Sequence, residues 1–303
     1  MEIILKEIEE MTSSIKREEF LFSNYIWYKT LKEGIKDFRI GFIKIKDIIM
    51  PFGYKKMGIF YSIYFSPYTT PYIFKQELDF DFILKKLKFV VFIEIVDFCK
   101  KLKENKNLIK IKNFYYNINL KKEISEIEKN YKKSLREQIR QAKRKGVYFR
   151  KMREEDLLDF YKIYEKLMKF KYKKKPSLPF SFISSIYKNL FPEWADGFIA
   201  EIDGKIKSAV ICLHPYKNFS LAFIQGTDPD YYSYRPSSFI FSEIIRYYKE
   251  KNFEKFSFGL TPPESSGTLF FKESFGCEKE EVYIYRFISP FYKIYEKIRN
   301  LKF

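Results

Sequence analysis

The hydrophobic positions are most regular in the second half of the chain. Apolar residues at three- and four-residue steps predict a helix over 154–170 and a second one over 180–191. The runs 198–202 and 206–213 predict strands, and Asp203-Gly204 between them predicts a hairpin turn. Further runs predict strands at 147–152, 220–225, 253–258 and 280–287 and helices at 237–251 and 268–275, with Ser237 or Ser238 capping the first of these helices. From residue 147 the predicted order is therefore β-α-α-β-β-β-α-β-α-β.

The first half of the chain has a weaker pattern. It predicts helices at 19–32 and 80–88 and strands at 38–49, 56–66, 90–96 and 109–120. This succession is compatible with a degenerate copy of the same α/β unit. A chain of 303 residues is long enough for two domains. We therefore expect an α/β protein of the mixed-sheet (α+β) kind, with one domain over 1–123 and a second over 124–303.

One long helix is predicted over 124–145, and Gly146 would end it. Basic residues at four-residue steps form a stripe beside its apolar face: Lys132, Arg136, Arg140 and Arg144. A stripe of this kind suits a run of phosphates. The alternative is an ordinary solvated helix face.

Composition and charge narrow the possible partners. Hydrophobic residues make up 46% of the chain and aromatic residues 20%, which excludes a disordered chain. The formal net charge of +18 favours a polyanionic partner, such as nucleic acid, a phosphorylated cofactor or an anionic membrane surface. The alternative is that a Lys-rich and Glu-rich surface reflects genome composition or growth at high temperature.

The cysteines and the terminal segments indicate a compartment. Cys99, Cys212 and Cys277 have no metal-binding spacing and form no even-numbered framework, so we expect a reducing cytosol and no metal site. The first residues lack the features of a signal peptide, and no apolar window reaches the roughly 18 residues of a membrane span. The basic segment 289–302 predicts a helix that would suit an anionic bilayer. The expected location is cytoplasmic, with peripheral contact at the inner membrane surface left open.

The run from Gly267 to Gly276 carries the clearest candidate chemistry. In it Lys272 follows Phe271 on a short predicted helix. A lysine against apolar neighbours is partly desolvated, and its charge can then stabilise an anion strongly.

Several segments together resemble the FemAB-like proteins. The segment 134–147 is similar to the "lr..irkA.kkGv" segment that opens the second domain of that family, and 198–226 is similar to its hairpin and following strand. Phe256-Ser257-Phe258-Gly259, followed by Gly267, Phe271-Lys272 and Phe275-Gly276, resembles the family's "f.f.g... g...FK..FG" block. The segment 66–72 resembles the Pro-rich part of the first domain. The resemblance covers about residues 126–287.

This resemblance implies two tandem GNAT-like domains, the first degenerate, with the active cleft in the second domain or between the two. FemAB-like enzymes include transferases that move an aminoacyl group from tRNA to an amine of a peptidoglycan precursor, and other relatives use acyl-CoA. Carried over, stabilisation of the developing oxyanion falls on Lys272, with Phe271 shaping the site. The implied partners are an anionic donor, tRNA or CoA, and an amine acceptor, with no tightly bound cofactor.

One loop departs from the pattern of CoA-dependent GNAT proteins. These usually carry a glycine-rich loop whose backbone N–H groups hold pyrophosphate. Here residues 226–238 lack the glycine pair and contain Asp228 and Asp230. This difference favours the FemAB-like interpretation over a standard acetyl-CoA enzyme. Together with the stripe, the expected donor- or substrate-binding residues are Gln225, Arg235, Ser237 and Glu264.

No general base is identifiable, because His214, the one histidine, is more typical of a structural residue. Three functions are therefore compared. The first is an N-acyltransferase of the FemAB-like group that acts on an amine of a cell-envelope or peptide-like acceptor. The second is an acyl-CoA-dependent N-acetyltransferase acting on a sugar amine or protein. The third is a non-catalytic module that binds nucleic acid or a membrane surface.

Overall fold

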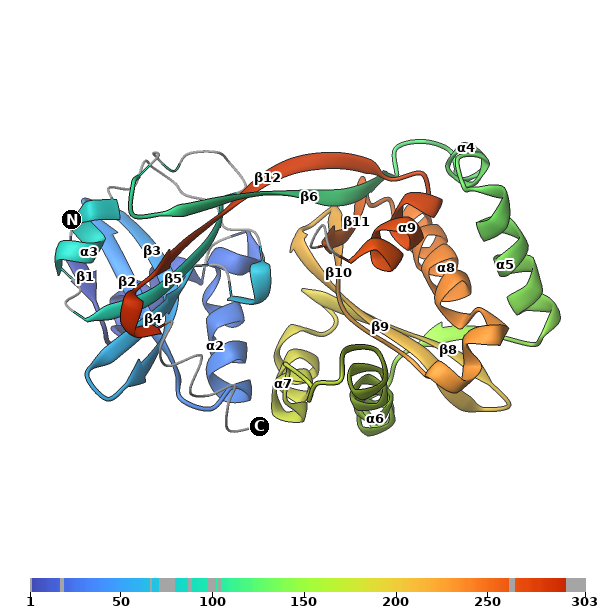
Figure 1. The fold of residues 1–303 in the computed structure, drawn as a ribbon, viewed down its shortest axis with the longest axis horizontal. Coiled ribbons are helices and arrows are strands. Elements are labelled where there is room, and N and C mark those ends of the chain that lie inside the picture. The colour runs from blue at the N-terminus through green and yellow to red at the C-terminus, as the bar shows by residue number, and fades with distance from the viewer. Residues whose placement is uncertain are drawn as a thin grey trace. The chain divides into compact units, whose positions relative to one another are not determined.

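The computed structural model describes residues 2–16, 19–65, 67–70, 80–86, 89–97, 102, 105–261 and 265–292. The chain divides into two compact units (Figure 1). Unit 1 comprises 1–113 and 281–303, and unit 2 comprises 114–280, apart from residues outside the described ranges. This division differs from the single boundary expected at 123/124. The difference arises because strands β6 (Ile109–Asn119) and β12 (Glu278–Ile288) each begin in one unit and end in the other.

Unit 1 is built on a sheet in the order β1-β2-β3-β4-β5-β12. Its neighbours run antiparallel except for the parallel pair β4·β5. The described strands that precede β6 are β1 (Glu2–Ile4), β2 (Phe38–Ile45), β3 (Ile48–Met57), β4 (Phe60–Tyr64) and β5 (Val90–Asp97). The helices are α1 (Glu9–Ile15), α2 (Tyr25–Gly34) and α3 (Phe80–Lys86), with short 3-10 turns η1 (Leu21–Ser23) and η2 (Pro67–Thr69).

Three sequence predictions for unit 1 need correction. The single strand expected at 38–49 is β2, a turn at Lys46, which has a φ of 53°, and the start of β3. The single strand expected at 56–66 is the end of β3, a turn and β4, because Gly58 adopts a φ of 62° and reverses the chain. The expected helix at 19–32 begins only at Tyr25, where Asn24 accepts a hydrogen bond from the Ile26 N–H at 2.9 Å and caps it. β1 and α1 were not predicted from the pattern.

Unit 2 follows the predicted element order from residue 147 onward. Its sheet has the order β6-β11-β10-β9-β8-β7, with β10 and β11 as the parallel pair. The strands are β7 (Tyr148–Lys151), β8 (Ala195–Ile202), β9 (Lys205–Tyr216), β10 (Phe219–Thr227) and β11 (Lys255–Leu260). The helices are α4 (Ile124–Lys129), α5 (Lys133–Arg144), α6 (Leu157–Leu167), α7 (Phe180–Leu190), α8 (Pro236–Glu250) and α9 (Ser266–Ser274), with short turns η3 (Glu154–Asp156), η4 (Met168–Tyr172, a π-helical turn) and η5 (Pro229–Tyr234).

The two units repeat one plan. Each runs β-α-α-β-β-β-α-β, and in each the fourth and fifth strands of this series are the parallel pair. The sixth place in each sheet is taken by a strand from elsewhere in the chain order. β12 pairs with β5 in unit 1, and β6 pairs with β11 in unit 2. The degenerate internal copy expected from the sequence therefore exists, with its last strands exchanged.

The β8–β9 hairpin forms as predicted. Asp203 and Gly204 have φ values of 51° and 69°, so both central residues are left-handed, as a tight two-residue turn requires. Antiparallel pairing continues from Ile202↔Lys205 to Ala195↔Leu213. This hairpin forms the half of the sheet that α6, α7 and α8 cover (Figure 1).

The long helix predicted over 124–145 is broken. α4 ends at Lys129, and α5 starts at Lys133, because Lys132 has a ψ of 146° and is not helical. The Lys132 N–H leaves the helical pattern and donates to the carbonyl oxygen of Ser274 at 2.8 Å. Tyr131 is buried, and its ring packs at 5.2 Å from the ring of Phe275. A contact with residues far along the chain thus interrupts a segment that is locally suited to a helix.

The break depends on close approach at Gly276. Gly276 has a φ of 70°, and a Cβ atom there would lie 2.8 Å from the carbonyl oxygen of Asn130. Gly146 has a similar φ of 73° but nothing within 4 Å of the same position. A side chain at Gly146 would meet backbone strain alone, whereas one at Gly276 would meet both strain and steric overlap.

We expect Gly276→Ala to lower the free energy of unfolding by about 2–4 kcal/mol, because strain and overlap add. Gly146→Ala, the matched control, should cost only about 1 kcal/mol of strain. Urea unfolding followed by circular dichroism measures both. Equal losses in the two variants would contradict the close approach.

Candidate functional site

Lys272 is a buried cation on α9, with 6% of its surface exposed. Its Nζ donates hydrogen bonds to the carbonyl oxygens of Gly259 at 2.8 Å and Leu260 at 3.2 Å. Burial disfavours the charged form and lowers the pKa of Lys272 to about 7. The two carbonyl oxygens accept from Nζ and fix its position. The desolvated lysine expected from the sequence is present in this geometry.

Aromatic packing explains why the side chain of Lys272 is desolvated. The ring of Phe271 packs against Phe241, Phe258 and Phe275, with centroids 5.7, 6.4 and 5.2 Å away. These contacts hold α9 against α8 and β11. The ring of Tyr116 on β6, itself buried, lies 5.4 Å from the lysine Nζ. Phe271 therefore belongs to the packing that seats α9.

The acceptors of Lys272 lie where β10 and β11 part. Parallel pairing extends only from Phe219↔Lys255 to Leu221↔Ser257, although β10 continues to Thr227. Beyond Ser257 the register of β11 against β6 also shifts. Gly259, with a φ of 71°, turns the end of β11. The lysine Nζ is thus held at the end of β11, beside strand positions of β10 that have no partner on β11.

Two neighbours of Lys272 were not singled out from the sequence. The Cys277 thiol donates to the Lys272 carbonyl oxygen at 3.1 Å, and burial raises its pKa to about 12, so it stays a neutral thiol. Tyr116 comes from β6, more than 150 residues earlier in the chain. A spacing of five residues from Lys272 could have suggested Cys277. No local signal could have suggested Tyr116.

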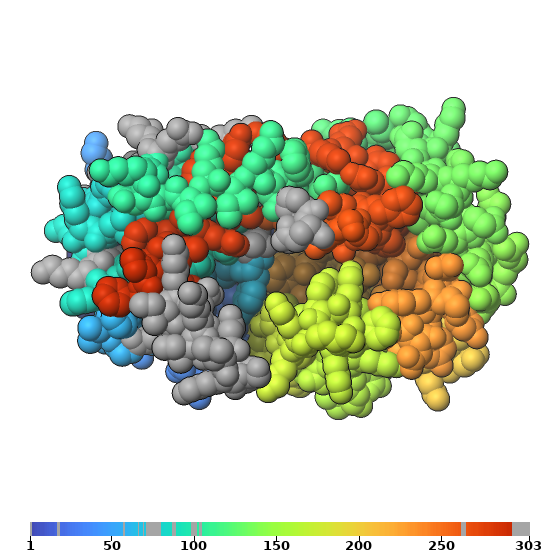
Figure 2. Space-filling model, viewed as in Figure 1, coloured from blue at the N-terminus to red at the C-terminus, as the bar shows by residue number. Residues whose placement is uncertain are grey.

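The basic stripe is exposed, with Lys132 just before α5 and the three arginines along it. Figure 2 shows this green part of the chain at the surface. Arg140 and Arg144 both pair with Glu137, at 3.0 and 2.8 Å. Lys132 lies over the ring of Phe270 on α9, with 4.7 Å from Nζ to the centroid. Arg136 donates to the Lys129 carbonyl oxygen at 3.5 Å. The structure thus brings Lys132 to the helix of Lys272, while the other three residues extend away along α5.

The loop after β10 carries further expected residues and one correction. Neither Ser237 nor Ser238 caps α8, because Pro236 begins the helix and Arg235 precedes it with a left-handed φ of 60°. The Ser237 hydroxyl is hydrogen-bonded with the Thr227 hydroxyl at 2.9 Å, and Ser238 donates to Gln138 at 2.7 Å. Both serine hydroxyls therefore bond to other side chains and not to the backbone N–H groups at the start of α8.

Arg235 is exposed, and its Nε donates to Gln141 at 3.4 Å near the far end of α5. Gln225 is half-buried on β10 beyond the parting point. Glu264 lies outside the described residues. Lys166 reaches into the same loop and pairs with Asp228 at 2.5 Å and Asp230 at 2.6 Å. The two carboxylates that distinguish this loop therefore share one lysine.

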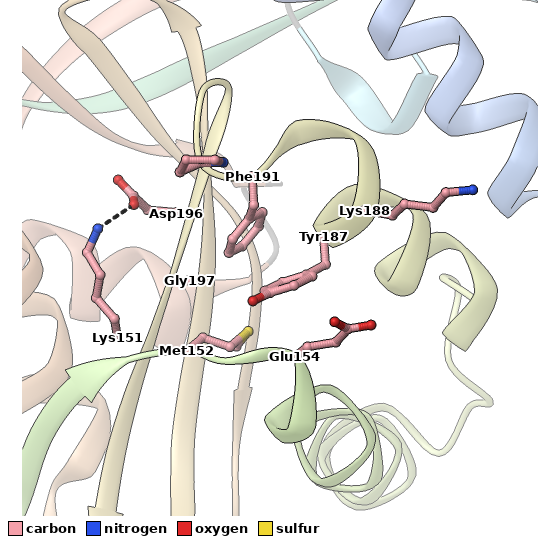
Figure 3. Close-up of a pocket in the computed structure, with 9 residues that line it drawn as sticks. Lys151, Met152, Glu154, Tyr187, Lys188, Phe191, Asp196 and Gly197 are labelled. Carbon is pink, nitrogen blue, oxygen red and sulfur yellow. Dashed lines mark hydrogen bonds and ion pairs between the residues drawn. The ribbon is translucent and has the colours of Figure 1, made fainter.

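His214 lies in unit 2, on β9. It is buried, and its Nε2 lies 3.2 Å from the Tyr248 hydroxyl and 3.3 Å from Asp196. Asp196 also pairs with Lys151 at 2.8 Å (Figure 3). This pair borders a cavity of about 460 Å³ between the ends of β7, β8 and α7. The cavity is lined by neither Lys272 nor any residue of the stripe.

The described residues contain no group of three or more His, Cys, Asp or Glu side chains that could hold a metal ion. Within the same part of the chain, no helix has both the length and the apolar character needed to span a bilayer.

Comparison with known proteins shows what the segment that carries these residues is similar to. Residues 129–272 match the model described as an acetyltransferase (GNAT) domain. This part of the chain, which includes α5 and Lys272, is therefore similar to GNAT domains, and that similarity supports acyl transfer in general. No curated protein matches the sequence.

Solved structures extend the similarity over both units. FemX has a TM-score of 0.64 at 13% identity, with 97% of this chain and 99% of that chain covered. The C-terminal domain of a putative lysylphosphatidylglycerol synthetase from Agrobacterium fabrum has a TM-score of 0.58 at 13% identity, covering 95% and 94%. L-PGS from Bacillus licheniformis has a TM-score of 0.57 at 13% identity, covering 94% and 93%. These similarities confirm the fold expected from the sequence, a mixed α/β structure of two tandem GNAT-like domains.

The lowered pKa of Lys272 predicts how the free energy of unfolding depends on pH. Between pH about 7 and 10.5 the unfolded chain binds a proton at this lysine that the folded chain does not. Relative to Lys272→Met, the wild-type free energy of unfolding should therefore rise with pH, by up to about 1.4 kcal/mol per unit. Urea unfolding at about pH 8 and about pH 9 measures this difference, because the other titrating groups cancel between the two proteins. Parallel pH dependences in the two proteins would mean that the lysine is solvated.

Proposed function

We propose that this chain is an N-acyltransferase that moves an aminoacyl or acyl group to an amine of a cell-envelope or peptide-like acceptor. The observation that carries the proposal is the Lys272 ammonium, buried on α9 and held at the point where β10 and β11 part. The reaction is aminolysis of an ester or thioester. A nitrogen–carbon bond forms, a carbon–oxygen or carbon–sulfur bond breaks, and the amine proton leaves with the released alcohol or thiol.

Lys272 would stabilise the oxyanion of the tetrahedral intermediate. An ammonium group has three N–H donors. Two of them meet the Gly259 and Leu260 carbonyl oxygens, and no third acceptor for Nζ occurs among the described residues. The remaining N–H is available for the developing anion. Because the site is desolvated, that one hydrogen bond carries more free energy than it would in water.

The packing of Phe271 supports this role indirectly. Its ring contacts fix α9 on the aromatic cluster, and so they fix the backbone from which Lys272 extends. No general base is assigned. The acceptor amine can lose its proton to the leaving group as the intermediate collapses, which requires no protein base.

For the donor, we favour aminoacyl-tRNA over acyl-CoA. A CoA pyrophosphate at the loop after β10 would meet Asp228 and Asp230, two carboxylates that share the single cation Lys166. Like charges held close together disfavour binding. The exposed stripe and Arg235, by contrast, offer cations along one helix and beside its far end, as an extended phosphate chain requires.

An acyl-CoA donor is the second candidate. It is supported by the helix α8, whose N-terminus follows β10 and has Arg235 and Ser237 beside it.

One neighbour in fold favours the aminoacyl donor instead. Its name, a putative lysylphosphatidylglycerol synthetase, describes the joining of lysine to a lipid. Either donor would be a substrate, with no tightly bound cofactor.

The third candidate, a non-catalytic module that binds nucleic acid or membrane, predicts that Lys272 is dispensable.

We place the protein in the cytoplasm, with peripheral contact at the inner membrane surface. Most of the basic segment expected to make that contact, residues 293–302, lies outside the described residues.

Lys272→Met should lower turnover about 10²–10³-fold with little change in donor binding, since one oxyanion donor is removed. The assay follows transfer from charged tRNA and, separately, from radiolabelled acetyl-CoA to candidate amines. Lys279→Met is the matched control, because Lys279 also lies near the Tyr116 ring but is exposed and paired with Glu273. The ratio of wild-type to Lys272→Met turnover should fall as pH rises through about 7, where the ammonium deprotonates.

A ratio that instead rises with pH would assign Lys272 as a base. Unchanged turnover in Lys272→Met would reject its part in the reaction. If neither donor binds or reacts, both transferase candidates fail.

For the stripe, Arg136→Ala combined with Arg144→Ala should reduce the slope of log affinity against log salt for tRNA. Each single-stranded phosphate that the variant no longer neutralises makes this slope shallower by about 0.7. Arg153→Ala provides the control, as Arg153 is equally exposed but lies off α5. Filter binding over a salt series gives the slopes. A response identical to wild type would mean that the stripe contacts no phosphate.

A further inference from the structure

Residues 169–175, here called the lysine-aromatic loop, connect α6 to α7 and have the sequence Lys-Phe-Lys-Tyr-Lys-Lys-Lys. All seven residues are exposed. Phe170 and Tyr172 keep 56% and 45% of their surfaces in solvent. Five lysines and two large rings thus lie together, with no acidic residue between them.

The loop has a defined backbone. The π-helical turn η4 continues α6 as far as Tyr172, and Lys173 then reverses the chain with a left-handed φ of 53°. The Lys174 N–H returns to the Met168 carbonyl oxygen at 3.4 Å. The rings are therefore presented on a closed turn.

Two contacts fix the loop within unit 2. Lys171 donates to the Thr268 hydroxyl on α9 at 3.2 Å. The Phe170 ring meets the Tyr232 ring of η5 edge to face, with centroids 6.2 Å apart. The exposed face of the loop consequently borders the helix that carries Lys272 and the turn that follows β10.

The arrangement fits a lipid surface better than nucleic acid. Stacking of bases needs open ring faces, but Lys173 lies over the Phe170 ring and Lys171 over the Tyr172 ring. The loop also lacks arginine, the residue suited to bidentate phosphate contacts. Rings flanked by lysines instead match a bilayer interface, where the rings enter the head-group region and the ammonium groups meet anionic lipids.

We propose that the lysine-aromatic loop docks unit 2 on a bilayer surface that carries anionic head groups. The inference goes beyond the transfer reaction and does not depend on it. It is also independent of the segment 293–303, which is outside the described residues.

The test is flotation of the full chain, without any donor, with vesicles of phosphatidylcholine alone or mixed with phosphatidylglycerol. Wild type should bind only the mixed vesicles. Lys169→Glu combined with Lys174→Glu should weaken this binding about tenfold or more, because each basic residue near an anionic surface contributes to the attraction. Phe170→Ser should weaken it at constant charge.

Matched controls separate the loop from the overall positive charge of the chain. Lys205→Glu combined with Lys217→Glu makes the same charge change at exposed positions, the first residue of β9 and the residue that follows its end, and Tyr148→Ser removes a ring that is 62% exposed on β7. Both controls should bind as wild type. Thermal unfolding midpoints equal to wild type in every variant exclude a folding defect.

Three results would overturn the proposal. One is wild type that binds neither kind of vesicle. Another is equal weakening by the loop and control charge reversals, which would assign binding to net charge. The last is a loop that binds a mixed-sequence RNA oligonucleotide, with loss in the loop variants, while vesicles are not bound.

Discussion

The candidate site depends on two hydrogen bonds, which the buried Lys272 ammonium donates to the carbonyl oxygens of Gly259 and Leu260. An ammonium in an aromatic environment is costly unless it is hydrogen-bonded, so its position is tightly constrained. The carbonyl oxygens converge because Gly259 turns the end of β11 with a positive φ. α9 is seated by the Phe271 and Phe275 rings. A regular end to β11 or a looser α9 would leave the lysine either solvated or unpaired.

Local signals explain how much of the fold could be predicted. The element order of unit 2 follows from apolar periodicity, and the β8–β9 turn follows from Asp203-Gly204, because both are properties of neighbouring residues. The same holds for the candidate Lys272, whose aromatic neighbours Phe271 and Phe275 are close in sequence. Predictions failed where a distant group competed. The helix over 124–145 is broken by a bond from Lys132 to Ser274, and no pattern within the helix reveals that partner.

The strand exchange is the clearest limit of sequence reasoning. β6 alternates like any strand and follows β5, so the sequence favours one boundary after it. The pairing partner of an edge position depends on backbone hydrogen bonds that are nearly independent of side-chain type. β6 pairs with β11 and β12 with β5, so each unit is completed by a strand that crosses the boundary. Tyr116 lies beside Lys272 because β6 pairs with β11, and no motif close to Lys272 in the sequence indicates that contact.

The positive charge of the chain acts in two physically different ways. Lys272 is a single desolvated charge. Its electrostatic stabilisation would act on one oxyanion at hydrogen-bond distance, and salt would screen it only weakly. Arg140 and Arg144 are exposed and both pair with Glu137. Each therefore contributes little binding free energy alone, and a stripe binds phosphates only through the sum of several such charges. A net charge of +18 therefore does not by itself indicate catalysis. What distinguishes the transferase interpretation is that the buried, hydrogen-bonded ammonium of Lys272 lies in the segment that matches the GNAT model, at the end of the strand that parts from its neighbour.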